Sequence, residues 1–523
     1  MTLTDTATVT LSSLSDTERN ERFDRLQERM GQVWASMQHD LEGESVVVVP
    51  SLAVGSRPTS VAMIQAYEER FLFLLLLLRQ PMLRMTYITS EPIDPRIIEY
   101  YLALLPGVIP SHALARLTLI AVGDGTNRTL SEKVLERPRV LDRIARSIPD
   151  RQRCHLIPYN TTERERDLAL TLGIPMYGAD HRLAPLGTKT GCRRLFRAVG
   201  VQHPLGVEDL RSRDDVVRAI ESVLEEKPSV RQMIFKLDEG VSGSGNALVD
   251  VAGIADLAGD MRRAAIVDRL EAMRPELEDL TAGDMLDLLE TRHGIIEERI
   301  VGEEILSPSV QLRVLPDRTI ELLSTHDQLL GGPSGQRYLG CVFPADPAYS
   351  RLISEPALAV ARRLAEMGVR GRFALDFVVV RDAGGEWSPW AIELNLRKGG
   401  TTHPFLTLQF LTDGRYDSEE GAFITPEGAR KHLIATDHLE SDDLRALSVG
   451  DLFDAVARHA LHFDRSRQEG IVFHMISSIA ECGRIGMTAV GDTPERAREF
   501  YERGARILLE EAARARAEQA LPE

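Results

Sequence analysis

The first third of the chain alternates short apolar runs with segments of helical periodicity. Residues 46–49, 83–88 and 117–122 are dominated by apolar and β-branched side chains, and a helical segment near residues 95–104 lies between two of these runs. Strands and helices that alternate in this way are typical of a parallel sheet covered by helices. The pattern therefore predicts an α/β domain over residues 1–184.

From residue 185 onwards the pattern changes to a helix followed by many short strands. The expected elements are a helix over residues 188–199, strands within residues 233–251 and 295–300, and a charge-rich helical insertion over residues 267–290. This mixture indicates an α+β domain over residues 185–415. The remaining residues, 416–523, are expected to form a small domain that ends in an amphipathic Arg/Glu-rich helix.

Two predicted strands late in the second domain carry polar side chains on one face. Asp376 alternates with apolar neighbours in the first strand, and Glu393 and Asn395 do the same in the second. Gly384 and Gly385 between them indicate a tight turn. If these glycines form the centre of the turn, Asp376 lies directly opposite Glu393, with their Cβ atoms about 5 Å apart.

Two carboxylates at this separation repel each other unless a cation lies between them. Carboxylate and amide oxygens are hard ligands that suit Mg²⁺ or Mn²⁺, ions that also hold nucleotide phosphates. The hairpin therefore predicts a nucleotide–metal site formed by Asp376, Glu393 and Asn395. The alternative is a solvated acidic face on a surface hairpin.

The net charge of the chain limits the classes of ligand that it is expected to bind. Among the 523 residues, 79 acidic and 62 basic side chains give a net charge of −17, with a pI near 5.4. Nucleic acid is excluded as the main ligand, because its phosphates require a basic surface. The four cysteines are widely spaced and form no zinc-binding pair, which favours a reducing cytoplasm.

One apolar run, at residues 71–78, raises the question of a membrane. The run is far shorter than the ~20 residues that cross a bilayer, and charged residues flank it. The N-terminal residues also lack the basic and apolar regions of an export signal. We therefore expect a buried helix, no membrane partner and a cytoplasmic protein.

A glycine-rich loop lies between two predicted strands and is preceded by Lys236. Because it leads into a strand and not into a helix, its backbone N–H groups would close over phosphates as a flap, although a tight hairpin with bulges needs similar residues. Lys189, at the start of a predicted helix, is a second candidate cation or a solvated side chain. The loop residues expected to bind phosphate are Gly240, Ser242, Gly243, Ser244 and Gly245.

Residues 295–304 read as an acidic strand that breaks at Gly302. The backbone of Glu298 to Ile300 would hydrogen-bond an adenine edge, and a carboxylate beyond the turn would accept ribose hydroxyls. The alternative is an ordinary edge strand with protective charges.

The order of these features resembles the ATP-grasp superfamily from about residue 185 to residue 410. A lysine, a lysine with a glycine flap, a Glu-Glu-x-Ile-x-Gly-x-Glu segment, an Asp and a Glu-x-Asn follow one another along the chain. The resemblance implies that nucleotide phosphates contact Lys189 and Lys236 beneath the glycine loop. It also implies an adenine hinge at Glu297, Glu298 and Ile300, a ribose ligand in Glu304, and Mg²⁺ or Mn²⁺ ligands in Asp376, Glu393 and Asn395.

Further segments, at residues 324–345, 393–404, 473–475 and 486–491, are similar to the pheganomycin-type peptide ligases. This likeness implies a Rossmann-like pre-ATP-grasp domain, an ATP-grasp core and a small C-terminal domain. It also implies an enzyme that uses ATP to join an amino-acid-like carboxylate to an amine or peptide acceptor. The reaction would pass through an acyl phosphate and release ADP and phosphate.

Such a reaction needs charge stabilisation more than covalent help from the protein. Arg397 follows Asn395 by two residues, so we expect Arg397 and Lys236 to stabilise developing charge, although a surface arginine is the alternative. His326 is expected to deprotonate the amine, with Asp327 and His403 as further candidates. Each of these three side chains is equally well explained as a structural hydrogen-bonding residue.

Two other functions stay open at this stage. A kinase of the same fold would phosphorylate a hydroxyl, and a non-catalytic nucleotide-binding regulator would act without turnover, although the metal-binding residues argue against the regulator. The sequence does not identify the carboxylate, the acceptor or the oligomeric state, and a homo-oligomer is left open.

Overall fold

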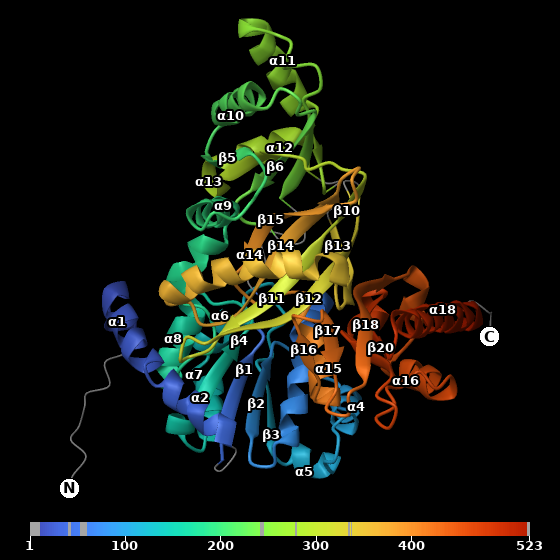
Figure 1. Cartoon of the computed structure of the whole chain (residues 1–523). Helices are drawn as coiled ribbons and strands as arrows, with labels where there is room; N and C mark the ends of the chain where they lie inside the picture. The colour runs from blue at the N-terminus through green and yellow to red at the C-terminus, as the bar shows by residue number, and fades with distance from the viewer. Residues whose placement is uncertain are drawn as a thin grey trace.

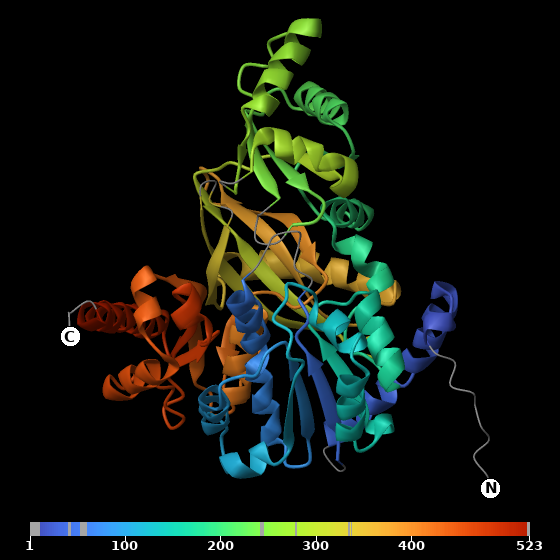
Figure 2. The same ribbon diagram turned by 180° about the vertical axis from the view of Figure 1, so that it is seen from behind.

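The computed structural model describes residues 11–39, 43–52, 60–240, 245–277, 280–332, 335 and 337–519. Figure 1 shows the N-terminal sheet at the base of an elongated molecule, a small sheet at the top, and a large sheet between them. The C-terminal helices lie beside the large sheet, and Figure 2 shows the same arrangement from behind.

The N-terminal domain is built on a parallel sheet, as predicted. Its strands are β1 (Ser45–Val49), β2 (Arg84–Thr89), β3 (Leu117–Ala121) and β4 (Cys154–Pro158), in the order β3-β2-β1-β4. Val46 and Val48 face one apolar cluster, and Val47 and Val49 face another, so helices cover both sides. The helices of this domain are α1 (Asp16–Gln27), α2 (Met30–His39), α3 (Val61–Glu69), α4 (Pro95–Ala103), α5 (Pro110–Leu114), α6 (Leu130–Leu135), α7 (Pro138–Ser147) and α8 (Glu163–Leu172).

The apolar run at residues 71–78 is buried, as expected, and forms the 3₁₀ helix η2 (Arg70–Arg79). It packs between the N-terminal domain and helix α15 (Thr402–Thr412) of the core. Within the described residues, no helix combines the length and apolarity needed to cross a bilayer.

The small upper sheet follows the order β5-β9-β6-β7-β8 and is antiparallel. Its strands are β5 (Gly206–Leu210), β6 (Gln232–Leu237), β7 (Asn246–Asp250), β8 (Arg274–Pro275) and β9 (Gly294–Glu298). Its helices, seen with it in Figure 1, are α9 (Lys189–Ala198), α10 (Arg213–Glu226), α11 (Gly259–Glu271), α12 (Ala282–Asp287) and α13 (Leu289–Arg292).

The prediction of one helix over residues 267–290 was wrong. Helix α11 ends at Glu271, and Arg274 and Pro275 then pair with β7 before α12 begins. Pro275 cannot continue a helix, because it has no backbone N–H to donate.

The large sheet joins the core to the C-terminal segment. Its strands run in the order β10-β14-β11-β12-β13-β18-β17-β16, with β15 beside β14, and with β20 between β18 and β19. They are β10 (Glu304–Leu306), β11 (Pro308–Val314), β12 (Ile320–Gly331), β13 (Arg337–Phe343), β14 (Gly371–Arg381), β15 (Trp387–Asn395), β16 (Arg415–Asp417), β17 (Ala422–Ile424), β18 (Arg430–Glu440), β19 (Gly470–His474) and β20 (Arg484–Gly491). The sheet is therefore continuous across the predicted domain boundary at residues 415 and 416.

Helices cover the large sheet on its apolar face and at its C-terminal end. α14 (Pro347–Glu366) packs on the face formed by Phe373, Leu375 and Phe377, so Asp376 projects from the opposite face. The C-terminal helices are α16 (Val449–Arg458), α17 (Ser478–Cys482) and α18 (Pro494–Gln519), and the last of these confirms the predicted amphipathic helix.

Helix α9 is fixed to the upper sheet by a buried ion pair. Arg193 Nη1 lies 2.7 Å from Glu297 Oε2 on β9 and donates to the carbonyl of Pro204 at 2.9 Å. Both charged side chains are almost fully buried. A buried charge that loses its partner destabilises a fold far more than an exposed charge does.

We expect the substitution Arg193→Met to lower the free energy of unfolding of the unit formed by α9 and the upper sheet by about 3–5 kcal/mol, because Glu297 loses a buried partner. The neighbouring substitution Arg194→Met removes an exposed pair with Asp209 and should cost about 1 kcal/mol or less. Urea unfolding of both variants measures the difference, and equal losses would contradict this assignment.

Candidate functional site

The hairpin β14–β15 brings two carboxylates together on the open face of the large sheet. Asp376 is the register partner of Glu393, as predicted from the sequence. The amide Nδ2 of Asn395 donates to Asp376 Oδ2 at 2.9 Å. From helix α9, Lys189 Nζ reaches Glu393 Oε2 at 2.6 Å.

This pairing depends on a β-bulge that the sequence analysis did not foresee. The turn is centred on Gly384, because Arg381 pairs with Trp387, and Gly385 adopts a positive φ of 86°. A bulge between Asp376 and Phe377 then shifts the register by one residue. The shift restores the predicted pair at the site.

The two carboxylates have different proton affinities. Burial, and then the charge of Glu393, raises the pKa of Asp376 to about 6, although a hydrogen bond from Ser309 and the charge of Lys189 act against the increase. Burial also disfavours the charged form of Glu393, but the ion pair with Lys189 outweighs it and holds that pKa below its ordinary value. One nearby ammonium therefore does not compensate both acids.

These side chains fit a divalent cation. Two carboxylates and an amide lie on one face of neighbouring strands, and the Asn395 amide can present its oxygen by rotating. Oxygen donors of this type are the ones that Mg²⁺ and Mn²⁺ prefer.

A second group of buried charges lies across the space between the two sheets. Lys236 Nζ on β6 lies 2.5 Å from Glu297 Oε1, and Arg193 holds the other oxygen of that carboxylate. Burial disfavours the charged form of Glu297, but Lys236 and then Arg193 outweigh it and lower its pKa. Lys236 also contributes to the low pKa of Glu393, so the two predicted phosphate-binding lysines face the same region.

In the predicted adenine hinge the backbone is available to a ligand, whereas the acidic side chains are held by other residues of the protein. Glu298 is held by Lys227 Nζ at 2.5 Å and by the backbone N–H of Leu205 at 3.0 Å. Among the described residues, the backbone N–H of Ile300 has no hydrogen-bond acceptor. Glu304 begins β10 and is about half exposed, and Arg381 lies 3.4 Å from it.

The glycine-rich loop has the predicted strand–loop–strand context, between β6 and β7. Gly240 and Gly245 are described, and the carbonyl of Gly245 accepts from Leu237 at 2.9 Å. Ser242, Gly243 and Ser244 lie outside the described residues.

Arg397 and Lys398 follow β15 directly. Arg397 is half-buried, and its charge contributes to the pKa values of Asp376 and Glu393. Lys398 Nζ donates to the carbonyl of Pro158 at 2.6 Å, which ties this segment to the N-terminal domain.

The three candidate proton-transfer residues lie in different surroundings. His326 is fully buried between the rings of Phe343 and Phe405, and burial lowers its pKa to about 3. Asp327 accepts from the hydroxyl of Tyr349 on α14 at 2.8 Å. His403 lies in a separate cluster of histidine and aspartate. The catalytic role of His326 remains a prediction, and its low pKa makes it a weak base at neutral pH.

Other residues of this region were not found from the sequence. Ser309 on β11 pairs with Asp376, and Gln311 hydrogen-bonds Thr401 and Thr402 beyond β15. Alternation within β11 was the available signal, because these polar residues alternate with Val310 and Leu312.

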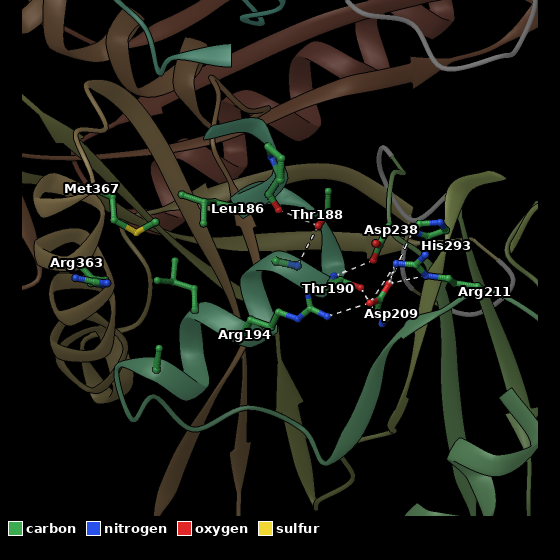
Figure 3. Close-up of a pocket in the computed structure, with 14 residues that line it drawn as sticks. Leu186, Thr188, Thr190, Arg194, Asp209, Arg211, Asp238, His293, Arg363 and Met367 are labelled. Atoms are coloured by element: carbon green, nitrogen blue, oxygen red, sulfur yellow. Dashed lines mark hydrogen bonds and ion pairs between the residues drawn. The ribbon is translucent and has the colours of Figure 1, made fainter. Parts of the chain in front are cut away.

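A cavity of about 550 Å³ lies on the other side of helix α9 and is distinct from this site. Figure 3 shows Thr190 and Arg194 of α9 at its wall, with Asp209 paired to Arg194 and Arg211. The cavity does not include Lys189, Lys236 or the hairpin carboxylates. The cavity is therefore separate from the group of charged side chains around Asp376 and Glu393.

Two family descriptions match parts of the chain. The family described as "IQCH-like, ATP-grasp" matches residues 183–269 and 283–419, and the family described as "PGM1 C-terminal domain" matches residues 451–504. Among solved structures, an N5-carboxyaminoimidazole ribonucleotide synthetase with ADP has a TM-score of 0.51 and 12% identity, covering 90% of this chain and 98% of its own. The synthetase of Staphylococcus aureus with ADP has a TM-score of 0.51 and 10% identity, covering 89% and 97%. These likenesses show the fold alone and confirm the predicted fold class.

Two curated relatives match over most of the chain. IQ motif-containing protein H of Danio rerio is 22% identical over 481 residues, which is 83% of this chain, and the match spans 45% of that protein. L-propargylglycine–L-glutamate ligase of Streptantibioticus cattleyicolor is 30% identical over 451 residues, covering 84% of this chain and 89% of the relative. The chain therefore belongs to the ATP-grasp superfamily and, within it, to the family of pheganomycin-type ligases.

Proposed function

We propose that this protein is an ATP-dependent carboxylate–amine ligase that forms an amide bond through an acyl phosphate and releases ADP and phosphate. The observation that carries the proposal is the pair of opposed carboxylates, Asp376 and Glu393, faced by Lys189 and Lys236. Membership of a ligase family supports it, and so does the activity of the relative, L-propargylglycine–L-glutamate ligase.

The nucleotide would lie between the upper and the large sheet. The backbone N–H of Ile300, which has no acceptor among the described residues, suits an adenine edge, and Glu304 would accept the ribose hydroxyls. Lys189 and Lys236 would contact the phosphates. The loop that begins at Gly240 and ends at Gly245 would cover these phosphates.

Asp376, Glu393 and Asn395 would hold the Mg²⁺ or Mn²⁺ ions. Bound there, the ions would neutralise the charge that develops during phosphoryl transfer. Lys189 Nζ, now paired with Glu393, would then be free to reach a phosphate.

The remaining chemistry requires positioning more than covalent participation. A carboxylate oxygen of the first substrate attacks the γ-phosphorus, the bond from that phosphorus to the β–γ bridging oxygen breaks, and ADP leaves with the electron pair. Arg397 and Lys236 stabilise the charge on the transferred group. The acceptor amine then attacks the acyl carbon, the C–O bond to phosphate breaks, and the amine loses a proton.

Two basic side chains support an acceptor with its own carboxylate. Arg372 lies on the same face of β14 as Asp376, and its Nη1 has no hydrogen-bond partner within the described residues. Burial, and then the charge of Arg372, lowers the pKa of Lys398 to about 7. Arg372 is half-buried and has the charge of Glu321 nearby, and Lys398 is buried. Because basic groups held away from water gain from an added anion, an amino-acid or peptide carboxylate is a fitting partner. We place this reaction in the cytoplasm.

The direct test is ADP release by the whole protein with pools of amino acids, with and without hydroxylamine. A ligase of this type should form a hydroxamate, because hydroxylamine captures an acyl phosphate. A phosphorylated alcohol without hydroxamate would establish a kinase instead, and nucleotide binding without ADP release would establish a regulator.

The substitution Asp376→Asn should lower kcat by about 100-fold or more, because the proposed site loses an anionic ligand of the metal ions that neutralise the charge developed during phosphoryl transfer. Asp382→Asn is the matched control, since Asp382 is exposed in the turn of the same hairpin and only accepts hydrogen bonds from Gly384 and Glu386. Steady-state ADP release measures both variants, and an Asp376→Asn enzyme with unchanged kcat would rule out this metal site.

A further inference from the structure

A second group of side chains of the types that bind metal ions lies away from the β14–β15 hairpin. His403 on α15, Asp437 on β18 and His474 on β19 are all buried, and their ligand atoms converge. The two Nε2 atoms are 3.0 Å apart, and Asp437 Oδ1 lies 2.8 Å from His474 Nε2 and 3.2 Å from His403 Nε2.

Hydrogen bonds alone do not satisfy this triangle. If both imidazoles donate to the carboxylate, two N–H groups meet at the 3.0 Å separation of their nitrogens. If His403 donates to His474, the accepting nitrogen of His474 faces the carboxylate oxygen with no proton between them. If His474 alone donates to the carboxylate, the unprotonated Nε2 of His403 faces Asp437 Oδ1 at 3.2 Å with no proton between them. Each of these arrangements leaves one unfavourable contact in a buried place, where such contacts are most costly.

A single metal ion removes the conflict. Three atoms at these separations can all lie about 2.1 Å from one ion placed roughly 1 Å above their plane, which matches ordinary Zn–N and Zn–O distances. We propose that His403, Asp437 and His474 bind a divalent first-row transition metal ion, with Zn²⁺ as the best match to two imidazoles and one carboxylate.

The surroundings of the cluster hold these side chains in place. Arg70 Nη1 lies 2.6 Å from the other oxygen of Asp437 and Arg70 Nη2 lies 3.1 Å from the hydroxyl of Tyr159, so Oδ1 is left for the ion. Gly486 is the register partner of His474, and a Cβ there would lie 2.1 Å from His474 Nε2. The imidazole therefore occupies space that only glycine leaves open.

The site joins three parts of the chain. Arg70 comes from the N-terminal domain, His403 from the core, and Asp437 and His474 from the C-terminal segment. The ion would fix α15 and, through it, the segment that carries Arg397 and Lys398. It is distinct from the proposed Mg²⁺ site, whose ligands come from β14 and β15.

The experiment measures metal content by mass spectrometry in the whole, tag-free protein purified from zinc-supplemented cells. We expect about one zinc per chain, retained in the variant Asp376→Asn. The substitutions His403→Gln and His474→Gln should each weaken zinc binding by more than about 100-fold. His432→Gln, on the same strand as Asp437 but outside the cluster, should bind zinc normally.

Because a variant that misfolds would also lose zinc, the wild-type protein provides the second readout. It is stripped with a chelator and titrated with Co²⁺, whose visible absorption reports four-coordinate nitrogen and oxygen ligands. One equivalent of intense absorption, displaced by Zn²⁺, supports the site. A metal-free wild-type protein whose Co²⁺ spectrum remains that of the hydrated ion would overturn the proposal, whatever the ligase activity.

Discussion

The structure depends on one electrostatic constraint, the opposition of Asp376 and Glu393 across a single pair of strands. Like charges at register-partner positions destabilise a hairpin unless positive charge reaches them. Lys189 supplies part of that charge from a helix of the other lobe. Helix α9 is therefore coupled to the β14–β15 hairpin at the site proposed for the Mg²⁺ or Mn²⁺ ions.

Buried charges on the upper sheet and helix α9 are likewise compensated by partners of opposite sign. Lys236, Glu297 and Arg193 are nearly inaccessible to solvent, although ion pairs of this kind seldom add net stability. We infer that these charges position one another. Glu297 holds Lys236 in place, and Arg193 holds Glu297. The Lys236 ammonium is therefore fixed in a position that faces the hairpin carboxylates.

Local patterns predicted much of this arrangement from the sequence. Alternation and glycine placement identified the hairpin and its facing carboxylates, although the turn is centred on Gly384 alone, which shifts the pairing register by one residue, and a bulge restores the register. The prediction of one helix over residues 267–290 failed because helix α11 ends at Glu271 and Arg274 and Pro275 then join the sheet. The cluster of His403, Asp437 and His474 was not predictable, because it depends on strands and a helix brought together by long-range folding. Likewise, nothing near Arg193 in the sequence indicates its pairing with Glu297.

Anomalous diffraction from crystals grown with Mn²⁺ and a non-hydrolysable ATP analogue tests the central claim most directly. The account predicts anomalous peaks between Asp376 and Glu393, with Asn395 as a neighbour and Lys189 moved from Glu393 towards the phosphates. Manganese peaks elsewhere, with Lys189 still paired to Glu393 and no ion between the carboxylates, would contradict it.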